Sequence, residues 1–127
     1  MTPPPRPTPA ELEILRLLWE NGPSTVREIQ ERMEQQRPTG YTTALKLLQI
    51  MTDKGLVRRD ETARAHVYAA GAPEDQTQRQ LVRDLLDRAF GGSATKLVMH
   101  ALSARKTSRA ELKRIREMLD RLEGGGE

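Results

Sequence analysis

Hydroxyl and ammonium side chains recur at helical spacing at Thr42, Thr43 and Lys46. A threonine hydroxyl donates or accepts a hydrogen bond, its methyl group can contact the methyl group of thymine, and a lysine can reach O6 and N7 of guanine or a phosphate. Threonine is also a weak helix former, so two threonines inside a helix favour a role other than folding. The alternative is that all three are ordinary exposed residues of a helix, and the surrounding elements have to decide between the two interpretations.

The sequence contains no arrangement that is typical of an enzyme or a metal site. Cysteine is absent, which excludes disulfides, thiolate metal sites and cysteine nucleophiles. His66 and His100 each lack a second metal-type ligand at helical or hairpin spacing. No glycine-rich phosphate loop, nucleophile elbow or pair of carboxylates is found. We therefore expect no catalytic residue, no metal and no cofactor.

Composition gives a weak electrostatic signal. The 127 residues carry 21 Lys and Arg against 18 Asp and Glu, a net charge of +3. Residues 1–73 and 74–127 are each nearly balanced, so a nucleic-acid-binding surface would have to come from charge arranged on one face. Aromatic residues make up 3% of the chain, which leaves too few stacking platforms for a single-strand binder.

The sequence favours a cytoplasmic protein. No apolar run approaches about 20 residues, the length of a membrane span, so we expect no membrane insertion. Residues 1–7 are rich in proline and have no apolar stretch, which predicts a disordered arm and not a signal peptide. The absence of cysteine suits a reducing compartment.

Two helices with the same start signal are predicted before residue 38. Thr8 and Glu11 form a capping box for the first helix, which ends at Asn21-Gly22-Pro23. Thr25 and Glu28 form a second capping box, and Arg37-Pro38 ends that helix because the residue before proline is driven out of the α region.

Thr39 is predicted to begin a third helix, which runs to about Lys54 with Gly55 as its left-handed cap. One face of this helix is apolar: Tyr41, Ala44, Leu45, Leu48 and Met51. The opposite face, here called the outer arc, has no acidic residue in its first three turns and comprises Thr39, Thr42, Thr43, Lys46, Gln49, Ile50 and Asp53.

After Gly55 the hydrophobic period changes. Residues 56–60 and 66–69 are strand-like and are joined by the polar turn 61–64, which predicts a β-hairpin. Candidate contacts to a nucleic-acid backbone lie in or beside this hairpin and at the starts of the second and third helices: Arg27, Thr39, Arg58, Arg59 and Arg64. For the hairpin arginines, the alternative is a solvated edge strand protected by charge.

The order of these elements, three helices followed by a hairpin, is the layout of a winged helix-turn-helix. The major groove of B-DNA is about 12 Å wide and admits one helix. The third helix must therefore bury one face and present the other to base edges. This context favours the interpretation of Thr42, Thr43 and Lys46 as base-reading residues.

Residues 74–122 are predicted to form further amphipathic helices, interrupted at Gly91-Gly92 and restarted by Ser93 and by a Ser108/Glu111 capping box. About 50 residues of helix cannot bury enough surface alone. Their apolar stripes either pack on the winged helix of the same chain or form a two-fold dimer, which we favour. The candidate dimerisation residues are Leu81, Val82, Leu85, Leu86, Leu97, Val98, Leu112, Ile115 and Leu119.

The expected fold class is mainly α with a small β-hairpin: a winged helix-turn-helix followed by a helical dimerisation region. We expect a disordered arm at residues 1–7, a DNA-binding domain at 8–72, a helical dimerisation domain at 73–123 and a flexible tail at 124–127.

Four segments of the chain together form a recognisable pattern: Thr8-Pro9-Ala10-Glu11-Leu12-Glu13-Ile14-Leu15 leading to Leu18-Trp19, Thr42-Thr43-Ala44-Leu45-Lys46-Leu47-Leu48, Asp53-Lys54-Gly55-Leu56-Val57 and His66-Val67-Tyr68. With these segments, the sequence over about residues 8–122 resembles the BlaI/MecI group of penicillinase and methicillin-resistance repressors. The resemblance implies homodimers that bind palindromic operators and repress resistance or stress genes.

The resemblance also implies possible protein partners, namely a membrane sensor protease or a protease downstream of it. In relatives with the full signalling system, cleavage falls at an Asn-Phe pair within the segment that matches Val98-Met99-His100-Ala101. This chain has His100-Ala101 at that place, and the departure puts the usual induction route in question. Copper-sensing relatives use a C-terminal cysteine cluster, which this chain lacks.

The sequence therefore predicts a transcriptional repressor that binds a double-stranded DNA operator as a homodimer. One alternative is a ligand-responsive winged-helix regulator whose helical half houses a small molecule. Another is a winged helix used only for protein–protein docking, which would show no salt-sensitive affinity for DNA.

Overall fold

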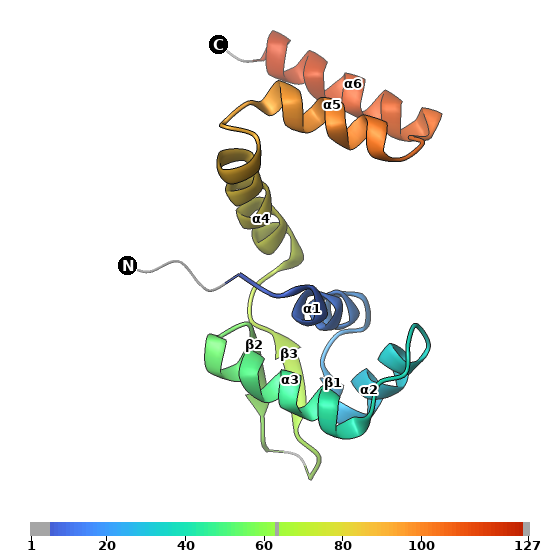
Figure 1. Cartoon of the computed structure of the whole chain (residues 1–127), viewed down its shortest axis with the longest axis vertical. Coiled ribbons are helices and arrows are strands. Elements are labelled where there is room, and N and C mark those ends of the chain that lie inside the picture. The colour runs from blue at the N-terminus through green and yellow to red at the C-terminus, as the bar shows by residue number, and fades with distance from the viewer. Residues whose placement is uncertain (1–5, 63, 126–127) are drawn as a thin grey trace. The chain divides into compact units, whose positions relative to one another are not determined.

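The computed structural model describes residues 6–62 and 64–125, and Figure 1 shows its helices and strands. The chain divides into two compact units, and the first ends at Val82 and the second begins at Arg83. The elements follow in chain order: α1 (Pro9–Asn21), β1 (Ser24–Thr25), α2 (Val26–Glu34), α3 (Tyr41–Lys54), β2 (Val57–Asp60), β3 (Val67–Ala70), α4 (Glu74–Ala89), α5 (Ala94–Ala104) and α6 (Arg109–Gly124).

The predicted helix starts are confirmed where a side chain caps the helix. Thr8 caps α1, Thr25 caps α2 and Ser108 caps α6, each in a reciprocal capping box with the glutamate three residues later. Ser93 caps α5 by accepting from the Lys96 N–H. These bonds satisfy backbone donors that have no partner inside the helix.

The predicted ends of α2 and α6 and the predicted start of α3 are wrong by a few residues. Helix α2 ends at Glu34, before Arg37, and α6 continues through Gly124 into the predicted tail. Helix α3 begins at Tyr41, with Gly40 in the capping position and no capping side chain. Thr39 therefore precedes α3 and is not part of it. Residues 1–5 and 126–127, to which the predicted arm and tail extend, lie outside the described residues.

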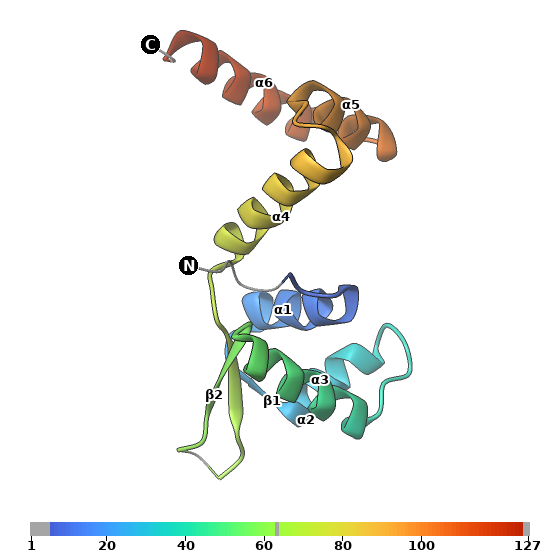
Figure 2. The same cartoon turned by 60° about the vertical axis from the view of Figure 1, so that its left-hand side comes forward.

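The predicted hairpin is present, and one further strand joins it. Strands β2 and β3 pair antiparallel with Val57 opposite Ala70 and Asp60 opposite Val67. The two-residue strand β1 pairs with the other edge of β3, with Ser24 opposite Tyr68, so the sheet order is β1-β3-β2. Figure 2 shows the hairpin of β2 and β3 extending beyond α1, α2 and α3, as the wing of a winged helix does.

A single apolar cluster joins α1, α2, α3 and the sheet. Its fully buried members come from all these elements: Ile14, Leu15, Leu18, Val26, Ile29, Met33, Ala44, Leu48, Met51, Val57 and Tyr68. The predicted apolar face of α3 is confirmed for Ala44, Leu48 and Met51, and Leu45 is half-buried. The prediction is wrong for Tyr41, which is 46% exposed because it lies in the first turn, beyond the edge of the cluster.

The exit of β3 is fixed by two backbone contacts. The Gly71 N–H donates to the Leu56 carbonyl at 2.8 Å, and the Trp19 indole donates to the Ala72 carbonyl at 3.0 Å. A Cβ at Gly71 would lie 2.6 Å from the Gly55 carbonyl oxygen, so only glycine permits this close approach. The first turns of α4 consequently belong to the winged-helix unit, and Thr77 is buried there.

In the second unit, no residue between 83 and 125 is buried in a single chain. Neither α5 nor α6 contains a buried residue. Both helices are amphipathic, and their largest apolar side chains stay open to solvent, with Leu119 54% and Met99 63% exposed. No helix within residues 6–62 or 64–125 is long and apolar enough to cross a membrane.

Candidate DNA interface

The start of α3 is held against α2 by a cluster of hydrogen bonds around Thr39. The Thr39 N–H donates to Glu34 Oε2 at 3.0 Å, and Gln30 Nε2 donates to the Thr39 carbonyl at 2.9 Å. Gln30 Nε2 also donates to Glu34 Oε2 at 3.1 Å, which closes the cluster. The loop from α2 to α3 is thereby fixed at the point where α3 leaves it.

Thr39 does not lie on the outer arc, contrary to the sequence prediction. Only 7% of the residue is exposed, and its hydroxyl donates to the Arg37 carbonyl at 3.0 Å. A buried hydroxyl that is already bonded cannot reach a phosphate. The pattern misplaced it because Thr39 looks like a helix cap in the sequence, whereas the helix starts two residues later.

The remaining outer-arc residues are open to solvent. Thr42, Thr43 and Lys46 are exposed, and their side chains form no hydrogen bond or ion pair with another described residue. Gln49, Ile50 and Asp53 continue the arc toward the end of α3 and are also exposed. A helix that presents uncommitted donors and methyl groups on one face, with its other face buried, has the form needed to enter a major groove.

A hollow of about 440 Å³ lies beside the start of α3, between α2 and the wing. Two of the candidate backbone-contact residues line this hollow: Arg27 from α2 and Arg64 from the loop between β2 and β3. The Arg27 guanidinium lies 5.8 Å from the centre of the Tyr41 ring, within the range of a cation–π contact. Neither arginine forms an ion pair with another described residue, so the structure brings two unneutralised cations next to the outer arc.

Arg59 differs from these two because it is already bonded. Its Nε lies 2.6 Å from Glu61 Oε2. Hydrogen bonds with Tyr68 and Glu61 raise the pKa of Arg59 above its ordinary value. A phosphate would have to compete with the Glu61 carboxylate for this guanidinium.

Arg58 lies in a different depression from Arg27 and Arg64. It pairs with Ala69 across the hairpin and lines a shallow hollow with Trp19 and Pro23. Successive residues of a strand point to opposite faces, so Arg58 and Arg59 face opposite ways. The sequence grouped the hairpin arginines together, but the pleat separates them.

The turn of the wing is stabilised by two hydrogen bonds between Asp60 and Thr62, which the sequence analysis did not predict. Asp60 Oδ1 accepts from the Thr62 N–H at 2.9 Å and from the Thr62 hydroxyl at 2.7 Å. This Asx-type turn reverses the chain direction, as an Asn-Gly or Asp-Gly pair would in a shorter hairpin. The bonds from Thr62 lower the pKa of Asp60, so its carboxylate stays charged to a lower pH than an ordinary aspartate would.

The candidate dimerisation residues fall into two groups by exposure. Val82, Leu85, Val98 and Leu119 are each 46–54% exposed. The others are half-buried: Leu81, Leu86, Leu97, Leu112 and Ile115. None of these side chains is buried in a single chain.

His100 and Ala101 both lie inside α5, away from its ends. The His100 ring lies 5.8 Å from the ring of Phe90, between ring centres, and is tilted by 43°. The bond between these two residues is therefore part of a continuous helix.

Comparison with known proteins gives consistent matches over nearly the whole chain. A sequence profile described as penicillinase repressor matches residues 7–121. The transcriptional regulator BlaI of Mycobacterium tuberculosis (strain ATCC 25618 / H37Rv) is 31% identical over 117 residues, which cover 91% of this chain and 83% of the relative. The penicillinase repressor of Staphylococcus aureus is 18% identical over 87% of this chain and 88% of its own length. The methicillin resistance regulatory protein MecI of Mammaliicoccus sciuri is 20% identical over 88% of this chain and 91% of its own length.

Proposed function

The chain belongs to the penicillinase repressor family, whose members are transcriptional repressors and not enzymes, and we propose that it represses transcription as a homodimer on a palindromic DNA operator. The observation that carries the proposal is the outer arc of α3. Thr42, Thr43 and Lys46 are exposed there, uncommitted, and free of acidic neighbours in the first three turns of the arc. In helix-turn-helix proteins, the N-terminal part of this helix meets the base edges.

Arg27 and Arg64 are proposed to bind backbone phosphates on either side of the base-reading residues. Both line the hollow beside the start of α3, and both lack a neutralising carboxylate among the described residues. Arg59 is proposed as a weaker phosphate contact because Glu61 already occupies its guanidinium. Arg58 is proposed to contact phosphate only if the DNA reaches the other face of the wing.

The dimer is proposed to form through residues 73–123, which comprise α4 and the helices of the second unit. Helices α5 and α6 leave apolar side chains exposed along one stripe each, and a second copy of the chain would cover them. A two-fold dimer presents two copies of α3 related by symmetry, and such a pair reads an inverted repeat. Doubling the site also supplies the specificity that a single short recognition helix lacks.

The regulated genes are proposed to be resistance or stress genes, on the strength of the relatives' names. A sensor protease or its downstream protease is proposed as a partner. His100-Ala101 lies within α5, so cleavage there would require local unfolding of the helix. The proposed induction route is therefore either a protease with a different preference or release without a cut at this bond. The site of action is proposed to be the cytoplasm.

Selection from a randomised duplex library tests the proposal. The full chain should enrich duplexes that contain an inverted repeat, with half-site centres separated by about one helical turn or a multiple of it. The best duplex should bind at least about a thousandfold more tightly than a scrambled one. Enrichment of no sequence, with weak binding that does not respond to salt, would contradict the proposal and favour the protein-docking alternative.

A further inference from the structure

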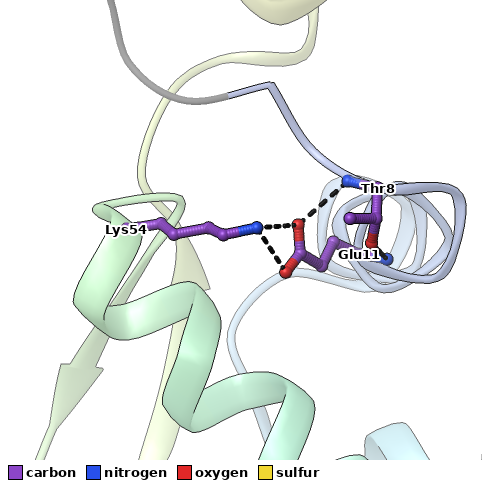
Figure 3. Close-up of polar contacts among 3 residues, drawn as sticks. All are labelled: Thr8, Glu11 and Lys54. Atoms are coloured by element: carbon purple, nitrogen blue, oxygen red, sulfur yellow. Dashed lines mark hydrogen bonds and ion pairs between the residues drawn. The ribbon is translucent and has the colours of Figure 1, made fainter.

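An ion pair ties the end of α3 to the start of α1, at the opposite end of α3 from the Thr39 cluster. Lys54 is the last residue of α3, and its Nζ lies 2.9 Å from both carboxylate oxygens of Glu11 (Figure 3). The same carboxylate accepts from the Thr8 N–H at 2.9 Å, and the Glu11 N–H donates to the Thr8 hydroxyl at 3.2 Å. Only 2% of Glu11 is exposed.

The other two capping boxes of the chain show that a cap needs neither burial nor a lysine. Glu28 and Glu111 occupy the same position in α2 and α6, and both are exposed. Neither forms an ion pair with another described residue. Capping of α1 therefore does not explain why Glu11 is buried or why it pairs with Lys54.

Keeping a charged carboxylate in the interior is costly unless its partners compensate. Burial by itself raises the pKa of Glu11, but the hydrogen bonds from Thr8 and Lys54 outweigh it and hold the pKa below its ordinary value of 4.5. The two charges also suit the helix ends, since Glu11 lies at the positive end of α1 and Lys54 at the negative end of α3. The pair is thus well compensated, and losing either member would leave the other with an unmatched charge.

The geometry of the pair restricts how α3 can move. The buried face of α3 is made of Ala44, Leu48 and Met51, and apolar contacts are not directional. A carboxylate held by its own cap and bonded through both oxygens to one ammonium specifies position at that end. At the other end, the Thr39 cluster specifies position against α2. Rotation or sliding of α3, which would re-aim the outer arc, breaks one of the two attachments.

We propose that Glu11 and Lys54 are positioning residues for DNA recognition: by fixing the axial position and rotation of α3, the pair sets how well its outer arc discriminates between sequences. The proposal rests on the proposed function, because it assigns a role to residues that do not face the DNA. Neither residue belongs to the outer arc or to the hollow beside it.

The test compares operator and scrambled duplexes with folded variants of the full chain. Glu11→Gln keeps a capping side chain but removes the charge, and Lys54→Met keeps the apolar stem. Each should lower the ratio of operator to scrambled affinity by roughly 3- to 30-fold. Lys54→Arg should restore the ratio to within about threefold, since a guanidinium also binds a carboxylate through two bonds. Glu28→Gln, in an exposed capping box, is the matched control and should leave the ratio unchanged.

Circular dichroism at the assay temperature establishes that each variant is folded. If Lys54→Met unfolds because it leaves the buried Glu11 carboxylate unmatched, Glu11→Gln carries the test, because the Lys54 side chain is 28% exposed and its charge can be solvated. Folded variants with lower melting temperatures but the wild-type ratio would overturn the proposal and leave the pair a purely structural role. A wild-type chain that does not discriminate at all would instead overturn the proposed function, and this inference with it.

Discussion

Single residues on α3 divide into those that hold the fold and those that remain available to a ligand. Leu48 and Ala44 have no exposed surface, whereas Lys46, between them in the sequence, is exposed and has no partner among the described residues. The two sets alternate along one helix with a period of 3.6 residues, so substitutions in one set need not disturb the other. Experiments on this helix can therefore separate stability from recognition.

Glu11 gives a residue-scale prediction about pH. Its pKa is lower in the folded chain than the ordinary value of 4.5, so its contribution to stability is fully present above that value and is lost as the pH falls through the folded pKa. At pH 7, Glu11→Gln should lower the free energy of unfolding by about 1–3 kcal/mol. The difference between variant and wild type should shrink below pH 4.5, as measured by urea unfolding across a pH series.

Glu20→Gln serves as the control for this series, because Glu20 is an exposed residue of α1 with no hydrogen bond to another described residue. It should change the free energy of unfolding by no more than about 0.5 kcal/mol at neutral pH. A Glu11→Gln penalty that stays constant from neutral to strongly acidic pH would show that the penalty comes from shape or packing and not from the charge.

For single residues, the sequence predicted hydrogen bonds between neighbours in the chain better than burial or contacts between residues far apart in the chain. The capping roles of Thr8, Thr25 and Ser108 follow from residues three positions apart, and all three are confirmed. The burial of Thr39 and the ion pair of Glu11 with Lys54 depend on residues up to 43 positions apart, which periodicity cannot detect. Tyr41 was misassigned because its position on the helical wheel is apolar while its position along the helix lies beyond the core.

At the scale of elements, the three arginines of the wing differ in how well each is placed to bind a DNA phosphate. The sequence grouped Arg58, Arg59 and Arg64, but pairing across the sheet and the Glu61 ion pair distinguish them. Only Arg64 shares the hollow with Arg27 on α2. The pleat and a neighbour two residues away decide these differences, and neither is visible until the strands are paired. Strand β1 was missed for the same reason, since two residues have no period.

Salt dependence tests this assignment at the scale of the element. Each phosphate that a cation neutralises contributes about −0.9 to the slope of log K against log salt concentration. Replacing Arg27 and Arg64 together with alanine removes four phosphate contacts from the bound dimer, which should reduce the magnitude of the slope by about 3.6 and weaken binding to operator and scrambled duplexes alike. The slopes are measured by fluorescence anisotropy titrations at several salt concentrations.

Arg16→Ala removes one positive charge per chain from the exposed surface of α1, away from the hollow, and should leave the slope nearly unchanged. Replacing Arg59 alone should have a smaller effect than replacing Arg64 alone, because Glu61 competes for its guanidinium. If the Arg27/Arg64 variant keeps the wild-type slope, these arginines are solvated surface residues and do not contact phosphate.

For the whole molecule, assembly has to account for the apolar surface of the second unit. Four large side chains of α5 and α6 exceed 50% exposure in the single chain: Met99, Met118, Leu119 and Leu122. Apolar surface of this extent on an amphipathic helix marks an interaction site. The hydrophobic period of the sequence predicted these apolar stripes. A period cannot show which surface covers them, and we propose that a second copy of the chain does.

The 127-residue chain should therefore sediment as a dimer at micromolar concentration, and Val98→Asp or Leu119→Asp should shift it to monomer. Both residues are about half exposed in one chain, so a charge there disrupts the dimer without disrupting a single-chain core. The monomeric variants should also lose operator affinity, because each would bind one half-site. Thr95→Asp, at an exposed polar position of α5, is the control and should remain dimeric. A wild-type monomer in sedimentation equilibrium would contradict the proposed assembly.

The central claim is that the outer arc of α3 reads DNA sequence, and the binding of Lys46→Ala to single-base variants of the selected operator tests it most directly. The substitution should cost about 1–3 kcal/mol for each half-site and relax the preference at one position of each half-site. Thr42→Ala and Thr43→Ala should fold normally and weaken discrimination, whereas Leu48→Ala should cost about 2–5 kcal/mol of stability with discrimination intact in the folded fraction. If the three outer-arc variants all fold and keep the wild-type preference at every position, α3 is not the reading element and the central claim is wrong.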